Sequence, residues 1–167
     1  TALIANRIRQ NPMDFGNSTT FAVTCNIPQI AEQSKQLLQM VNYFGLGEVE
    51  WMYDPVTETY KFLEINTRAW KWHTISNQLG FSFIGAMIDN YNGTTATIAN
   101  YTQSVGWVER LTDWTVVTKE ILRGKMTIKD VCKTYRIKKE NAVWQWTDPL
   151  PGIMYILMAP ILYIKRY

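Results

Sequence analysis

The apolar residues of this chain recur at two spacings, and each spacing predicts a different kind of element. From Pro28 to Tyr43, apolar side chains return every three or four positions, as they do along one face of a helix. Pro28 suits the first helical turn, and Gly45 is placed to end the helix. Similar spacing predicts further helices over residues 73–79, 82–91, 114–123 and 128–135.

Residues that favour helix ends support these boundaries. Gly80 and Gly124 follow two of the predicted helices, and glycine commonly ends a helix because it adopts the left-handed conformation. Asp113 precedes another helix and is expected to cap it. Thr127 and Asp130 have the spacing of a capping box before the helix that follows them.

Polar and apolar residues alternate over residues 48–54 and 60–66, and an Asp-Pro pair opens a turn between them. This pattern predicts an antiparallel hairpin. In its second strand, Leu63 and Ile65 are expected to be buried, whereas Glu64 and Asn66 point to the other side. Further strands are predicted over residues 2–12, 105–108 and 142–146.

Taken together, these elements predict an α+β fold in which helices flank an antiparallel sheet. No repeat and no linker rich in Pro, Gly or Ser divides the chain. We therefore expect a single domain over residues 1–167, in which residues 101–167 form a helical tail region packed on the rest.

The composition narrows the function classes. The chain has 167 residues, 47% of them hydrophobic, and a formal net charge of +3 from mixed acidic and basic residues. The sequence has no basic arm or tail, so nucleic acid is not expected as a partner. Without a signal peptide, a cytoplasmic location is expected. The apolar terminal segment is interrupted by Pro160 and is shorter than the roughly 20 residues needed to cross a bilayer, so a buried helix is expected rather than a membrane anchor.

The chain has few of the residues that bind soft metals. Cys25, Cys132 and His73 do not have the spacing of a zinc site, and two buried thiols are the simplest interpretation of the cysteines.

The predicted hairpin carries the most informative polar residues. Glu64 and Asn66 share one side of their strand, and the predicted turn places Glu50 opposite Glu64. Three oxygen-bearing side chains on one face suit a hard cation such as Mg²⁺, and Arg68 beyond the strand suits a phosphate oxygen. The alternative is an exposed sheet face whose polar residues are merely solvated.

A resemblance to a known family favours the metal site. GLGEVEWMYDPVTETYKFLEINTRAWKWH, residues 45–73, resembles the carboxyl-terminal metal-binding hairpin of ATP-grasp ligases, which has an acidic residue on one strand and Glu-x-Asn-x-Arg on the next. The chain is most similar to carboxylate-amine ligases, in the superfamily of carbamoyl-phosphate synthase-like proteins and D-aspartate ligases. RIRQNPMDFG and DPLPG resemble other parts of these proteins, and the similarity becomes loose after about residue 100.

The resemblance implies a role for each matching residue. Glu50, Glu64 and Asn66 match ligands of Mg²⁺ or Mn²⁺, and Arg68 matches an arginine that contacts the reacting phosphate or acyl group. His73 is near the site by sequence and is a candidate cofactor-binding residue, of which an ordering hydrogen bond is expected rather than proton transfer. The implied reaction uses ATP to phosphorylate a small carboxylate, and an amine then displaces the phosphate.

The part that the first strand plays is left open. Arg7 and Arg9 share a face of the predicted strand. They either face the ATP phosphates or lie on a solvated edge.

The chain also departs from the family pattern. Trp70, Lys71 and Trp72 replace the residues that handle bicarbonate in the biotin-carboxylase branch, so biotin carboxylation is not expected. The two tryptophans either wall an acceptor pocket or pack in the core. No glycine-rich phosphate loop occurs in these residues. The resemblance therefore implies a carboxyl-terminal half whose amino-terminal half holds the nucleotide lid, inactive by itself.

Two rival functions remain. One is a non-catalytic interaction domain derived from an ATP-grasp enzyme. The other is a helix-turn-helix binding module over residues 126–143, with basic side chains available for phosphates: Lys133, Arg136, Lys138 and Lys139.

Overall fold

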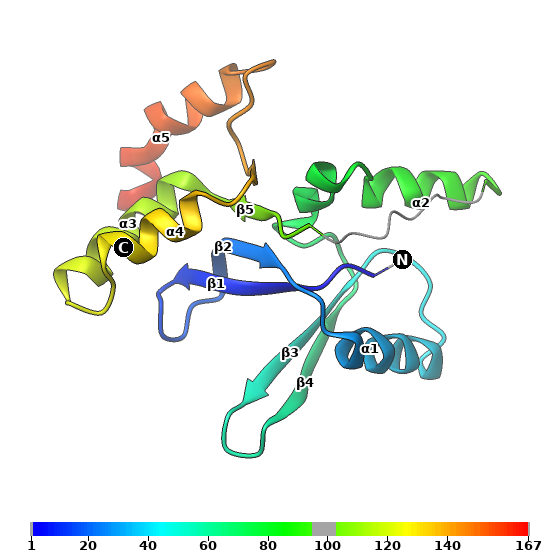
Figure 1. Ribbon diagram of the computed structural model, residues 1–167. Helices are drawn as coiled ribbons and strands as arrows, with labels where there is room; N and C mark the ends of the chain where they lie inside the picture. The colour runs from blue at the N-terminus through cyan, green and yellow to red at the C-terminus, as the bar shows by residue number, and fades with distance from the viewer. Residues whose placement is uncertain (1, 95–102, 167) are drawn as a thin grey trace. The chain divides into compact units, whose positions relative to one another are not determined.

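The computed structural model describes residues 2–94 and 103–166, and the side chains of residues 162–166 are left aside. The chain forms two compact units (Figure 1). Unit 1 consists of Thr1–Asn6 and Val23–Val105, and unit 2 consists of Arg7–Ala22 and Gly106–Tyr167. The single-domain organisation expected from the sequence stays a prediction, and each unit is described by itself.

Unit 1 contains a long hairpin and three helical segments. The elements are α1 (Pro28–Met40), β3 (Glu48–Asp54), β4 (Thr59–Asn66), the 3₁₀ helix η1 (His73–Leu79) and α2 (Phe83–Tyr91). All were expected from the sequence, although η1 is a 3₁₀ helix. Gly80 ends η1 at φ 82°, a left-handed conformation that glycine adopts without steric cost. Ser82 caps α2 by accepting from the Gly85 N–H.

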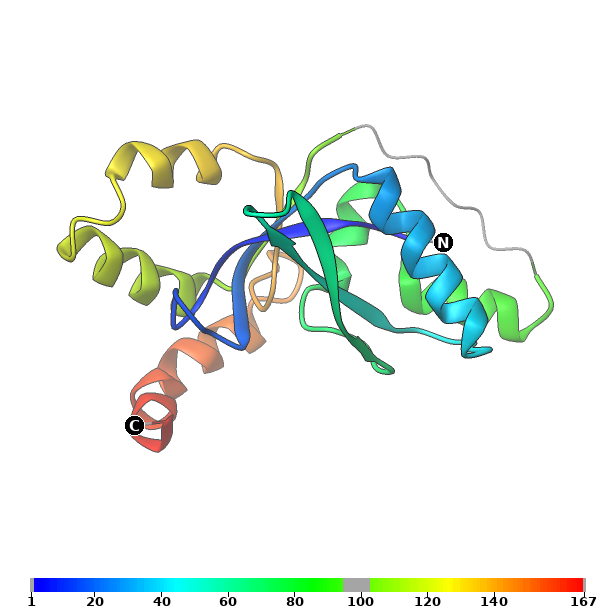
Figure 2. The same ribbon diagram turned by 90° about the horizontal axis from the view of Figure 1, so that it is seen from below.

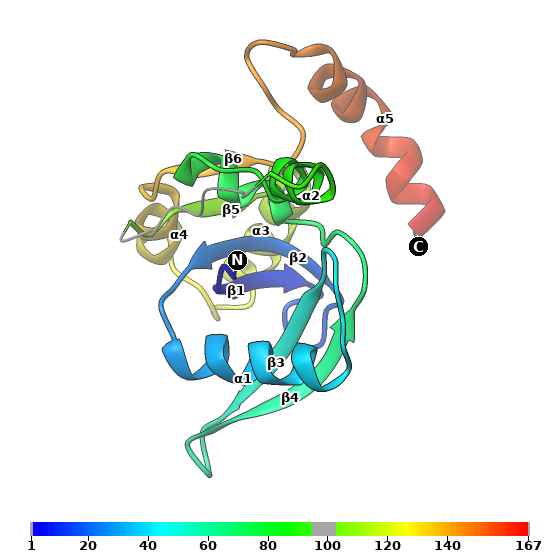
Figure 3. The same ribbon diagram turned by 90° about the vertical axis from the view of Figure 1, so that its right-hand side faces the viewer.

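Helix α1 lies beside the hairpin (Figures 1 and 3). Trp51 of β3 joins them, because its Nε1 donates to Ser34 Oγ of α1 at 2.9 Å. Across the hairpin, the Trp51 ring packs edge-on against Phe62 with 5.7 Å between centroids.

The strands of unit 2 form a sheet of order β1-β2-β5-β6, with β1 at Ala5–Asn11, β2 at Ser18–Thr24, β5 at Gly106–Val108 and β6 at Lys139–Asn141. Unit 1 includes the first residues of β1 and the last residues of β2. β2 and β5 are antiparallel, because Thr24 bonds to Val105 while Glu109 bonds to Thr20. β5 and β6 are parallel.

Three helices complete unit 2: α3 (Arg110–Leu122), α4 (Ile128–Tyr135) and α5 (Leu150–Arg166). Figure 2 shows α3 and α4 as consecutive helices joined by a short loop. The predicted capping box is confirmed, since the Thr127 and Asp130 side chains each bond to the other's backbone N–H.

A buried ion pair fixes β1 to α3. Arg9 is 2% exposed and Asp113 is fully buried, and Arg9 Nε and Nη2 donate to the two Asp113 oxygens at 2.8 and 2.9 Å. Thr20 and Tyr135 also donate to Asp113, and Arg9 Nη1 donates to Thr134 at 2.9 Å. Burial, followed by the Asp113 charge, raises the pKa of Tyr135, so its phenol stays a donor. Every nitrogen of the Arg9 guanidinium thus has a protein partner.

This ion pair corrects two expectations. Asp113 does not cap α3: Glu109 does, through its side chain, which accepts from the Thr112 N–H at 3.2 Å. Arg9 does not lie on a solvated edge, and its guanidinium faces Asp113 instead of an open surface. Arg7 is partly buried and donates to Gln10 at 3.4 Å.

One strand was missed, and two strand and helix expectations were wrong. β2 was not predicted, although its Thr and Val residues favour strands. The strand expected over residues 142–146 is instead irregular, and the chain pairs earlier, at β6. Residues 126–143 contain one helix followed by β6, so they lack the second helix of a helix-turn-helix.

The terminal helix is less buried than expected. The apolar side chains of α5 between Leu150 and Ile161 include several that are exposed by 43% to 65%. Among the described residues, no helix is long and apolar enough to cross a membrane. Cys132 is likewise exposed, and Cys25 is half-buried, so two buried thiols were not a correct interpretation. The α+β class with an antiparallel hairpin is confirmed.

We expect Asp113→Asn to destabilise unit 2 by about 3–5 kcal/mol, because it leaves the buried Arg9 guanidinium without its carboxylate. Urea unfolding measures the loss. Asp14→Asn is the matched control, since Asp14 is exposed and 3.5 Å from an exposed Lys125, and it should cost at most about 1 kcal/mol. Equal losses in both variants would contradict a structural role for the pair.

The turn of the β3–β4 hairpin predicts an unusual acid titration. Lys61 beside Asp54, at 2.9 Å, and the Val56 N–H lower the pKa of Asp54 to about 2. The turn contact is therefore complete above pH about 4 and is lost as the pH falls through about 2. Carboxyl ¹³C NMR should show this titration, and Lys61→Gln should move it upward. Lys35→Gln, which changes a lysine of α1, should leave it in place.

Candidate functional site

The polar side chains expected on the hairpin meet on one face. Glu50 of β3 pairs with Glu64 of β4, and Glu48 pairs with Asn66. Asn66 Nδ2 donates to Glu50 Oε1 at 3.1 Å and to Glu64 Oε1 at 2.9 Å. The predicted pairing of Glu50 with Glu64 is confirmed. We call Glu50, Glu64 and Asn66 the acidic triad.

A β-bulge produces this pairing. From the turn upward, Asp54 pairs with Thr59 and each later pair keeps that register as far as Trp51 with Phe62. The same register would place Leu63, not Glu64, opposite Glu50. The register shifts by one residue between Trp51 and Glu50, so Leu63 is passed over and Glu64 faces Glu50. Because a one-residue slip moves a side chain to the other face, the bulge decides where the carboxylate points.

The bulge lies in an exposed part of this strand. Leu63 is 49% exposed and Phe62 is 43% exposed. The sequence predicted Leu63 to be buried because it alternates with Glu64, and that prediction was wrong. A bulged residue leaves the regular alternation, so its burial does not follow from a period of two.

The acidic triad has the oxygen ligands that a hard cation such as Mg²⁺ requires. Glu64 is exposed, and Glu50 and Asn66 are half-buried, so one side of the triad is open to solvent. Two carboxylates and a carboxamide supply oxygen ligands, and Mg²⁺ commonly takes its remaining ligands from water and phosphates. Within the described part of the chain, including this hairpin, no group of three or more His, Cys, Asp or Glu side chains is arranged to hold a metal ion. The arrangement fits an open cation site rather than a closed protein cage.

Asn66 holds the two carboxylates together. Two like charges opposite each other on a hairpin repel, and the positive end of the amide dipole lies against both. Its nitrogen, not its oxygen, faces the carboxylates. The torsion that turns the amide over has a broad, roughly two-fold profile, so exchanging nitrogen for oxygen costs little apart from the two hydrogen bonds.

Arg68 and His73 lie just beyond β4. Arg68 is exposed, and its Nη1 donates to the Ala69 carbonyl at 3.4 Å. His73 begins η1, and its Nδ1 lies 2.7 Å from the Trp70 carbonyl, which is the ordering hydrogen bond expected from the sequence. Contact of either residue with substrate stays a prediction.

Trp70 is a core residue of unit 1. It is 5% exposed and packs edge-on against Phe83 and Trp72, with centroids 5.0 and 5.5 Å apart. Of the two interpretations left open for these tryptophans, packing therefore describes Trp70. The packing of Trp70 against Phe83 and Trp72 anchors the end of β4 and the start of η1 on α2.

Sequence reasoning missed two features of this hairpin. One is the bulge at Leu63, for which the sequence carries no local signal. The other is Glu48, which lies directly opposite Asn66 and two positions before Glu50, so it shares their face. Its spacing from Glu50 was the available signal.

Comparison with known proteins agrees with this geometry. Residues 15–95, just under half of the chain, match the family described as carbamoyl-phosphate synthase L chain, ATP binding domain. The matched segment contains the whole β3–β4 hairpin and the triad. No curated protein and no solved structure matches the chain. The match supports an ATP-grasp domain of the carboxylate-amine ligase type over residues 15–95.

Proposed function

We propose that the acidic triad binds Mg²⁺ or Mn²⁺ together with the phosphates of ATP, as part of an ATP-dependent carboxylate-amine ligase. The observation that carries this proposal is the single amide of Asn66 bonded to both Glu50 and Glu64. Opposed carboxylates destabilise a hairpin unless something positive lies between them. A cation site accounts for their presence on an exposed face.

The three triad residues would hold the cation through their oxygens. Glu50 and Glu64 each present a carboxylate, and Asn66 contributes its Oδ1 after its amide turns over. When bound, the cation neutralises charge on the β- and γ-phosphates of ATP during phosphoryl transfer. The exposure of Glu64 leaves room for the phosphates on the outer side of the triad.

Arg68 would contact the reacting phosphate or acyl group. It stands two residues after Asn66, outside the strand, and its long side chain is exposed and free to turn from the Ala69 carbonyl. A guanidinium binds a phosphate through two parallel N–H bonds. His73 lies further along the chain, and its hydrogen bond to Trp70 would order the segment that carries Arg68.

The reaction that this site would serve forms a C–N bond in two steps. A carboxylate oxygen of a small substrate attacks the γ-phosphorus of ATP, and ADP leaves, which gives an acyl phosphate. The nitrogen of an amine then attacks the acyl carbon, the C–O bond to phosphate breaks, and phosphate leaves. The match to an ATP-binding domain supports ATP as one of the substrates.

Mn²⁺ titration of the whole chain tests the metal site. We expect paramagnetic broadening of the Trp51 indole signal, because Trp51 adjoins Glu50 and pairs next to the bulge. Glu64→Gln should weaken Mn²⁺ binding by about tenfold or more, since it removes a charged ligand. Glu58→Gln, in the exposed turn of the same hairpin, is the matched control. Equal binding by the Glu64→Gln variant and the native chain would refute the site.

Replacement of Arg68 should affect the binding of nucleotide and not the binding of the metal. Arg68→Gln should leave Mn²⁺ affinity unchanged and weaken binding of Mn²⁺ with ADP by about tenfold, because a charge-assisted bond to phosphate is lost. Calorimetry with Mn²⁺ alone and then with ADP separates the two. Arg136→Gln, which removes an exposed arginine of unit 2, should change neither value. Loss of Mn²⁺ affinity in the Arg68 variant would contradict its assignment to phosphate.

A further inference from the structure

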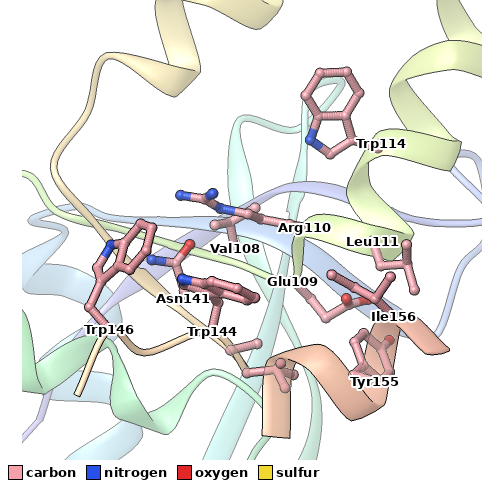
Figure 4. Close-up of a pocket in the computed structure, with 13 residues that line it drawn as sticks. Val108, Glu109, Arg110, Leu111, Trp114, Asn141, Trp144, Trp146, Tyr155 and Ile156 are labelled. Carbon is pink, nitrogen blue, oxygen red and sulfur yellow. The ribbon is translucent and has the colours of Figure 1, made fainter. Parts of the chain in front are cut away.

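Unit 2 contains a cavity that the proposed ligase function does not use. Its volume is about 370 Å³, within the usual range for small-ligand sites of about 300–1,000 Å³. All of its lining residues fall between 108 and 156, outside the segment that matches the ATP-binding domain. The walls come from the start of α3, the segment after β6 and the first turns of α5 (Figure 4).

The walls of the cavity are largely aromatic and aliphatic. Trp114 comes from α3, Trp144 and Trp146 from the irregular segment after β6, and Tyr155 and Ile156 from α5. Aromatic faces attract both apolar groups and cations.

One of these walls is fixed by a glycine. A Cβ on Gly152 of α5 would collide with the six-membered ring of Trp144, so the absent side chain lets the indole lie directly on the helix. The segment after β6 is irregular instead of forming the predicted strand, and its Trp144 packs on α5.

Two polar groups at the cavity have unused hydrogen-bond capacity. Glu109 is 4% exposed, and while its Oε2 caps α3, its Oε1 is buried and has no partner within the described part of the chain. Asn141 Oδ1 is also buried and unpartnered there. Leaving such groups unpaired is destabilising, more so for a charged group, so a ligand that donates hydrogen bonds to them would be favoured.

A ligand that pairs with these two oxygens would have to donate hydrogen bonds to them. A carboxylate and an amide oxygen accept, and neither can donate. An anionic ligand would be repelled by Glu109, and a purely apolar ligand would leave both oxygens unpaired. A positively charged amino group satisfies a carboxylate and an amide oxygen together, and its apolar remainder suits the tryptophan walls.

We propose that this cavity binds a small ligand that carries an ammonium group on an apolar body. The ammonium donates to Glu109 Oε1 and Asn141 Oδ1, and the body packs against Trp144, Tyr155 and Ile156. Both oxygens are covered in this structure, so the Glu109 and Asn141 side chains each turn about their last torsion to meet the ligand, a motion with a broad energy profile. The exposed Arg110 on the cavity wall suits a carboxylate if the ligand is an amino acid.

The test is an NMR titration of the ¹⁵N-labelled chain, followed through its tryptophan indole signals. The probes are 2-phenylethylammonium, its neutral analogue 2-phenylethanol, the anion 3-phenylpropanoate, and L-phenylalanine. We expect saturable shifts of the Trp144 and Trp114 signals with the amine, and no shift of Trp51 or Trp72 in unit 1. The amine should bind about tenfold more tightly than the alcohol, and the anion most weakly.

Variants of Glu109 and Asn141 test whether these two side chains bind the ammonium group. Glu109→Gln keeps an oxygen for the α3 cap but should abolish the preference for amine over alcohol. Asn141→Asp adds a second carboxylate and should tighten amine binding, which keeps the test decisive if the Glu109 variant unfolds. Asp148→Asn removes an exposed carboxylate outside the cavity lining and should change nothing.

Equal affinities for amine and alcohol, tighter binding of the anion, or no saturable shift of Trp144 with any probe would each overturn the proposal. Tighter binding of L-phenylalanine than of the amine would support it and assign the carboxylate to Arg110, and Arg110→Gln should then remove that gain. The reverse order would support a simple amine as the ligand.

Discussion

Two carboxylates can share one cation only when they lie on the same side of the β3–β4 hairpin, and the strand register decides this. The tight turn at Asp54 sets one register, in which Glu50 would face Leu63. The bulge at Leu63 sets another, in which Glu50 faces Glu64. Every functional statement about this hairpin depends on that one-residue shift, because without it Glu64 would point to the opposite face. Bulges beside functional sites commonly re-aim a side chain in this way.

The two units obtain their stability by different means. In unit 1, the end of β4 is held by aromatic packing, in which Trp70 contacts Phe83 on α2. In unit 2, the centre is a buried ion pair in which Asp113 accepts hydrogen bonds from Arg9, Thr20 and Tyr135. A buried carboxylate with this many donors tolerates its desolvation, whereas removal of one charged partner leaves the other uncompensated. The first is a packing constraint, and the second is an electrostatic one.

The local signals in the sequence predicted the hairpin, most of the helices and the capping box at Thr127. They also predicted that Glu50 would face Glu64, although the assumed turn arrives at that pair without the bulge. These features depend on spacing and turn chemistry within a few residues. β2 was missed because its Thr-rich run lacks an apolar alternation, and β6 because its three polar residues form a strand only by pairing with β5.

Two of the wrong expectations share one physical cause. Asp113 was expected to cap a helix because carboxylates do so, but the same chemistry also suits a buried partner for Arg9, which is 104 positions away in the chain. Residues 142–146 were expected to form a strand because they alternate, yet Trp144 packs on Gly152 instead. In each case a tertiary contact competed with a local preference, and the spacing of residues along the chain does not reveal such contacts.

We propose that a cation, when bound, displaces the Asn66 amide nitrogen from its hydrogen bonds to Glu50 and Glu64. The most direct test is to titrate Mg²⁺ and ADP into the chain labelled at the Asn66 side-chain amide and to follow its two N–H signals. In the metal-free chain these protons are hydrogen-bonded to the carboxylates. The account predicts that both signals lose their hydrogen-bond shifts together and saturably as the amide turns its oxygen to the cation. Signals that stay unchanged at saturating Mg²⁺ and ADP would contradict it.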